Sequence, residues 1–203
     1  IAFSEDLQTP QRHGRRVAEL APNGQFHLLE GLGHCSLAGH RPQQEQPKAI
    51  IAPHAGYIYS GPTAARVFCR VEIPGLVVIV APNHTGVCEA ESGISLWESG
   101  AFRTPLGEVP VDADAAQALR EISKDFVAVD HDAHKSEHAI EVELPFLQML
   151  RADVRVVPLV IAFDAWRPAR VLGEMLARLV KAAGEPVLLL ASSDLNHYEP
   201  AAV

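Results

Sequence analysis

The sequence is poor in cysteine, in basic residues and in long apolar runs, and each shortage excludes a class of protein. Only three of its 203 residues are cysteines, with none in C-x-x-C spacing, so neither a disulfide framework nor a cysteine-based zinc finger is expected. Lysine and arginine number 17 against 25 acidic residues, a net charge of −8 that argues against non-specific binding to nucleic acid or an anionic membrane. No apolar run approaches the roughly 18 residues that span a bilayer.

The start of the chain and its few cysteines predict a cytoplasmic protein. Residues 1–10 contain two acids and no basic segment, unlike a signal peptide. A reducing compartment is the simplest setting for three scattered cysteines. The first residue is isoleucine, which is consistent with a fragment of a longer chain. Histidine is the residue in excess, with ten copies, and it is the side chain that metal sites and proton shuttles use.

Short apolar segments alternate with amphipathic ones after residue 47. Strands are predicted at 49–52, 76–81, 94–97, 126–129, 154–163 and 187–191, with shorter strands in 102–111. Helices are predicted at 60–70, 112–123, 137–151 and 168–183. Pro62 is expected near the first position of its helix, and Pro145 is expected to kink or interrupt the third helix. This alternation predicts an α/β fold with a layered αβα architecture and a mainly parallel or mixed central sheet.

Three of the predicted strands run directly into a loop that contains histidine. His54, His84 and His197 follow strands 49–52, 76–81 and 187–191, and Asp194 lies three residues before His197. Ligands of such folds bind outside the carboxyl ends of the strands. Each histidine alone is compatible with an ordinary loop residue, but together they favour a divalent transition metal or acid–base chemistry.

A fourth cluster, residues 131–138, lies between a predicted strand and a predicted helix. His138 and Glu141 are three residues apart and are expected to share one helix face. Glu143 is expected to be solvated. Cys88, four residues after His84, is a further candidate as a soft metal ligand.

Residues 47–200 resemble the Memo family, also called AmmeMemoRadiSam system protein B. The fold of that family resembles the class III extradiol dioxygenases, which use nonhaem iron. The matching segments are AIIAPHAGYIYSGPTAA, VVIVAPNHTG, FRTPLGEVPVD, HKSEHAIEVELPFLQ, VVPLVI and ASSDLNHYEP.

The resemblance implies a metal-binding, dioxygenase-like pocket. His54 and His84 match metal-ligand positions, and the resemblance implies Fe(II) or Cu as the metal. His197 and Asp194 match positions that orient the ligands or act as acid and base, with His138 and Glu141 close by as further catalytic candidates. A small molecule or a redox partner is implied, with a radical SAM protein as one candidate.

Two departures from the family pattern are expected to matter. Family members continue beyond the ASSDLNHYEP segment and supply a cysteine to the metal site, which no cysteine here matches, so a domain incomplete at its C-terminus is expected. Residues 1–42 instead resemble the C-terminal part of an α/β-hydrolase, with His34 at the position of its catalytic histidine. Residues 43–47 are predicted to be a linker and 48–203 the Memo-like domain. The sequence contains no G-x-S-x-G nucleophile elbow, so hydrolase activity is not expected.

The sequence leaves three functions open. The first is a metalloprotein with oxidoreductase-like chemistry. The second is a non-catalytic module that binds a peptide or a partner protein. The role of eukaryotic relatives in growth-factor-driven cell motility implies this function, but the motifs contain no arginine cluster that would bind the phosphate of a phosphopeptide. The third is an inactive fusion fragment.

Overall fold

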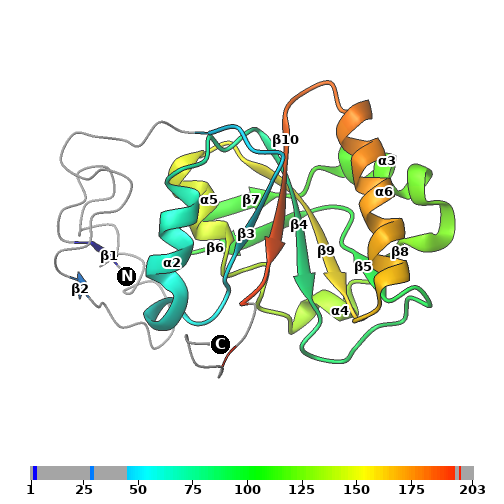
Figure 1. Ribbon diagram of the computed structural model, residues 1–203, viewed down its shortest axis with the longest axis horizontal. Coiled ribbons are helices and arrows are strands. Elements are labelled where there is room, and N and C mark those ends of the chain that lie inside the picture. Colours follow the sequence, from blue (N-terminus) through cyan, green and yellow to red (C-terminus); the bar gives the residue numbers. More distant parts are fainter. Residues whose placement is uncertain (1, 4–27, 30–44, 195–196, 198–203) are drawn as a thin grey trace.

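The computed structural model describes residues 2–3, 28–29, 45–194 and 197 (Figure 1). Most of the predicted hydrolase-like segment, including His34, lies outside the described residues. Within that segment, β1 (Ala2–Phe3) and β2 (Leu28–Leu29) pair in parallel. In the predicted linker, Glu45 forms an isolated parallel bridge with Val71.

A six-stranded sheet forms the centre of the fold, in the order β3-β10-β4-β9-β5-β8. The strands are β3 (Ala49–Ala52), β4 (Leu76–Pro82), β5 (Ile94–Leu96), β8 (Ala128–Val129), β9 (Arg155–Ile161) and β10 (Val187–Ser192). All neighbours are parallel except β5 and β9, which are antiparallel. The predicted mainly parallel or mixed sheet is therefore confirmed.

Helices cover both faces of this sheet (Figure 1). On one face, α2 (Tyr57–Phe68) and α5 (Leu144–Leu150) pack on the side chains of Val77 and Ile79. On the other face, α3 (Ala113–Ser123) and α6 (Trp166–Ala182) pack around Val78. Successive residues of β4 thus enter opposite cores, which is why this strand is apolar throughout. The predicted αβα layering is confirmed.

The remaining elements are short. A two-stranded hairpin consists of β6 (Ala101–Thr104) and β7 (Gly107–Pro110). A 3-10 turn, η1 (Lys124–Phe126), and a short helix, α4 (Asp132–Lys135), flank β8. Across the described part of the chain, none of the helices combines the length and the apolar character that crossing a membrane requires.

The predicted helix over 137–151 is wrong in its first half. Residues 139–143 form turns, and the helix α5 begins only at Leu144. Pro145 explains the difference, because it has no N–H to donate to the carbonyl of Glu141 and its ring would clash with that carbonyl. His138 and Glu141 therefore do not share a helix face. The start of α2 also differs, since the helix begins at Tyr57 and contains Pro62 in its interior.

Parallel pairing places the ends of three strands at one edge of the sheet. In the registers of the sheet, Ser192 of β10 lies opposite Ala52 of β3, and Ala191 lies opposite Val80 of β4. The loops that follow β3, β4 and β10 consequently leave the sheet side by side. This edge carries the candidate site.

Candidate metal centre

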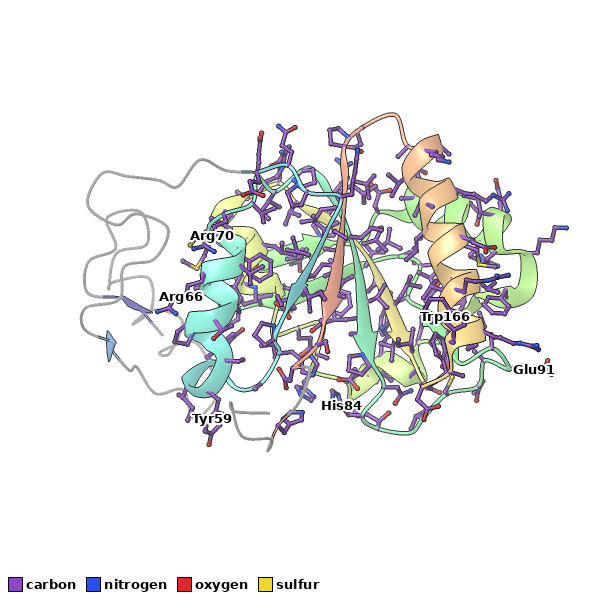
Figure 2. All side chains as sticks on the ribbon, viewed as in Figure 1. Tyr59, Arg66, Arg70, His84, Glu91 and Trp166 are labelled. Atoms are coloured by element: carbon purple, nitrogen blue, oxygen red, sulfur yellow. The ribbon has the colours of Figure 1, made fainter. Side chains whose placement is uncertain are left out.

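Three histidines meet beyond the carboxyl ends of β3 and β4. His54 follows β3, His84 follows β4, and His138 lies in the connection between α4 and α5. One ring nitrogen from each lies within 4.8 Å of the other two. Figure 2 shows His84 just beyond the end of β4. The sequence predicted His54 and His84 as ligands and His138 as a catalytic residue, and the structure brings all three together.

His54 is the buried member of the cluster, with 3% of its surface exposed. Its Nδ1 lies 2.8 Å from the Ser192 hydroxyl, which leaves Nε2 as the nitrogen available to a ligand. Burial lowers the pKa of His54, the charge of Asp194 opposes this, and the rings of His84 and His138 lower the pKa further. The net pKa lies below the ordinary 6.5, so the ring is neutral at neutral pH and its nitrogen can bind a cation.

His84 is held at two points by a single buried carboxylate, that of Glu137. Its Nδ1 lies 2.9 Å from Glu137 Oε1, and its backbone N–H donates to Glu137 Oε2 at 2.6 Å. The ring itself is 40% exposed. Because Nδ1 faces the carboxylate, Nε2 is again the free nitrogen. In metal sites a carboxylate commonly orients a ligand histidine in this way.

The same carboxylate also anchors His138. The backbone N–H groups of His138 and Ala139 donate to Glu137 Oε1 at 2.8 and 2.9 Å. The His138 ring stacks on that of His84, with centroids 4.8 Å apart and an interplanar angle of 28°. Burial by itself would raise the pKa of Glu137, but the hydrogen bonds from His84 and Ala139 outweigh it and lower the pKa below its usual range. Glu137 is therefore ionised at neutral pH.

Glu137 is a site residue that sequence reasoning missed. The only local signal is its position directly before His138, in the segment HKSEH. Its contact with His84 joins residues 53 positions apart, and that contact depends on how the loops fold.

Asp194 joins the loop after β10 to the loop after β3. Its Oδ1 accepts hydrogen bonds from the backbone N–H groups of His54 and Ala55, at 2.8 and 2.9 Å. Its Oδ2 lies 3.7 Å from Nε2 of His54 and 3.6 Å from Nε2 of His197. The carboxylate thus faces two of the histidines predicted from the sequence, and the His197 side chain is exposed.

Glu141 and Cys88 lie outside the three-histidine cluster. Glu141 is exposed, and partial desolvation raises its pKa, with His138 opposing that rise and Glu137 adding to it. The thiol of Cys88 instead contacts the Ser95 hydroxyl, at 3.5 Å, and the Ala90 carbonyl, at 3.7 Å.

Glu143 contradicts the expectation that it is solvated. Its side chain is fully buried, and its Oε1 lies 2.9 Å from the hydroxyl of Ser192. The reason is again the turn over 139–143, which replaces the predicted helix and directs this residue inward.

The donor set of the cluster fits a transition metal. Imidazole nitrogens suit Zn, Cu, Fe and Ni, and three histidines form a known catalytic metal site. In two of the three rings Nδ1 is already engaged by a protein group, so the opposite nitrogen is free for a ligand. The exposure of His84 and His138 leaves one side of the cluster accessible from solvent.

Comparison with known proteins gives one consistent family. The sequence model described as Memo-like protein matches residues 20–202. A MEMO1 family protein of Sulfolobus acidocaldarius is 39% identical over 183 residues, which cover 87% of this chain and 63% of that protein. The one from Aeropyrum pernix is 46% identical over 160 residues, 77% of this chain and 56% of that protein. The one from Aquifex aeolicus is 40% identical over 167 residues, 81% of this chain and 60% of that protein. The chain therefore spans 56–63% of the length of these relatives.

Proposed function

Because the chain belongs to the Memo-like protein family, we propose that it is a metal-binding protein whose centre is formed by His54, His84 and His138. The observation that carries the proposal is the convergence of their ring nitrogens within 4.8 Å. The motifs that hold them, PHAGY, PNHTG and SEHAIEVELP, lie within the part of the chain that the family matches.

Fe(II) or Cu is the metal that the resemblance to the Memo family favours, and iron is the metal of the extradiol dioxygenases that its fold resembles. Imidazole ligands are compatible with both metals. Such a metal would supply redox and Lewis-acid chemistry for an oxidoreductase reaction on a small molecule. The exposed side of the cluster, at His84 and His138, supports access by a small molecule.

The surrounding carboxylates would orient the ligand histidines and the residue that acts as acid and base. Glu137 keeps a hydrogen on Nδ1 of His84 and so keeps Nε2 free. Asp194 Oδ2 lies 3.6 Å from Nε2 of His197 and can orient that exposed ring. His197 would accordingly act as the acid–base residue at the edge of the site, with Asp194 orienting it.

Metal content of the purified chain tests the proposal. We expect near-stoichiometric Fe or Cu by mass spectrometry, and a loss of that metal in His54→Ala, His84→Ala and His138→Ala. His131→Ala is the matched control, because His131 pairs with Glu98 at 2.7 Å and is not a member of the cluster. Retention of metal in the three cluster variants would refute the site. Retention in His138→Ala alone would restrict the ligands to His54 and His84.

A further inference from the structure

The hydroxyl of Ser192 lies behind His54 and contacts three polar groups at once. Its Oγ is 2.8 Å from Nδ1 of His54, 2.8 Å from the carbonyl oxygen of Ala139 and 2.9 Å from Oε1 of Glu143. The side chain of Ser192 is buried, with 3% of its surface exposed. All three distances are those of hydrogen bonds.

Counting hydrogens assigns the direction of these bonds. A hydroxyl carries one hydrogen and can accept two further bonds. The carbonyl of Ala139 can only accept, so its contact with Ser192 requires the hydroxyl hydrogen. The two remaining contacts are hydrogen bonds only if the partner supplies the hydrogen. His54 must then carry a hydrogen on Nδ1, and Glu143 must carry one on its carboxyl group.

We infer that Glu143 is a neutral carboxylic acid that donates a hydrogen bond to Ser192 and thereby acts as a positioning residue for His54. An ionised Glu143 would attract the Ser192 hydrogen to itself. The Ala139 carbonyl would then face a bare hydroxyl oxygen at 2.8 Å, and two acceptors without a hydrogen between them repel each other.

The surroundings of Glu143 also favour the neutral form. Within the part of the chain that the structure describes, its Oε2 is buried and has no hydrogen-bond partner, which is far more costly for a carboxylate than for a neutral acid. Burial raises the pKa of Glu143 to about 8, partly offset by the Ser192 hydroxyl and reinforced by the charge of Asp194. Among the described residues, Tyr57 is a further titratable neighbour, since its pKa is raised by burial and by the charges of Glu143 and Glu141. Among the residues that the structure describes, no cation is one of the groups that shift the pKa of Glu143.

The inference has a consequence for the metal centre, and that consequence alone rests on the proposed function. With a hydrogen fixed on Nδ1, His54 presents the lone pair of Nε2 to the cluster. His84 is backed by an ionised carboxylate, that of Glu137, whereas His54 is backed by a neutral hydroxyl and a neutral acid. Ionisation of Glu143 would place a negative charge behind His54 and strengthen it as a ligand.

Infrared spectroscopy of the metal-free chain tests the protonation state directly. We expect the C=O stretching band of a neutral carboxylic acid at neutral pH, and loss of this band as the pH rises through about 8. The band should be absent from Glu143→Gln and present in the control Glu174→Gln, whose carboxylate is exposed. The same band in wild type and Glu143→Gln, or no such band in wild type, would overturn the inference.

A second measurement does not depend on any variant. In protein labelled with ¹³C at the glutamate side chains, one carboxyl resonance should titrate with a midpoint near 8, well above the 4.5 of an ordinary glutamate. If every glutamate resonance titrates in the ordinary range, the inference is wrong.

Metal titration separates this inference from the proposed function. The amide group introduced by Glu143→Gln can donate to Ser192 as the neutral acid does, so this variant should bind metal as tightly as wild type at neutral pH. Above pH 8 wild type should bind more tightly than the variant, because only wild type gains the charge. If wild type binds no metal while the infrared band is present, the proposed function fails and the assignment of Glu143 stands. If metal binds and the infrared band is missing, the assignment of a neutral Glu143 fails and the proposed function stands.

Discussion

Removing the charge of Glu137 should weaken the metal centre. Its two oxygens receive four hydrogen bonds, from the backbone and ring of His84 and from the backbone of His138 and Ala139. In Glu137→Gln one oxygen becomes an NH₂ group. Because three donors meet at Oε1 and one at Oε2, the least costly orientation turns the NH₂ toward the backbone N–H of His84.

The magnitude follows from the bonds that this orientation loses. One charge-assisted hydrogen bond disappears, worth about 1.5–3 kcal/mol of folding stability, and the other three lose the full charge of their acceptor. Changes of a group that orients a ligand typically lower metal affinity about 10–100-fold. We therefore expect Glu137→Gln to lower metal affinity within that range and to reduce the free energy of unfolding by about 2 kcal/mol.

Competition with a chelator measures the affinity, and urea denaturation of the metal-free chain measures the stability. Glu98→Gln is the matched control, since Glu98 also pairs with a histidine, His131, but lies outside the cluster. We expect little change in its metal affinity. Wild-type affinity in Glu137→Gln would refute the view that this carboxylate prepares His84 for a ligand.

Two further predictions concern the scaffold and its response to pH. Leu144→Ala, at the start of α5, should lower the free energy of unfolding by about 2–5 kcal/mol in urea denaturation, because the leucine is fully buried. Leu106→Ala, at a 38% exposed site, should lower it by less than about 0.5 kcal/mol. Equal losses in the two variants would contradict the assigned core. Burial lowers the pKa of His134 below 6.5, against the opposing effects of Ser95 and Asp130. As the pH falls, His134 therefore takes up a proton in the unfolded chain before it does so in the folded chain. The contribution of His134 to stability is therefore complete above pH 6.5 and is lost as the pH falls toward the lower folded-state pKa, and His134→Leu should show a smaller loss of stability below pH 6.5 than wild type. A parallel pH dependence in the two proteins would show that another group is responsible.

The sequence by itself determined the layers of the fold and two thirds of the histidine cluster. Continuous apolar segments such as 76–81 are typical of strands covered on both faces, and this local property predicted the parallel sheet with helices on each side. In such a sheet the strands end at a common edge. The positions of His54, His84 and His197 directly after their strands predicted that all three reach this edge, and the resemblance to the Memo family selected His54 and His84 as the ligands.

Only the tertiary structure decided how the site is completed. A periodic pattern of apolar residues predicted a helix over 137–151, but the missing N–H of Pro145 replaces its first half with turns. Those turns bring His138 to the cluster and bury Glu143 behind it. Glu137 reaches His84, and Ser192 reaches His54, Ala139 and Glu143, across 49 to 138 residues of chain. Local sequence predicts such contacts poorly, because their geometry depends on the loops packed around them and not on the residues beside them in the chain.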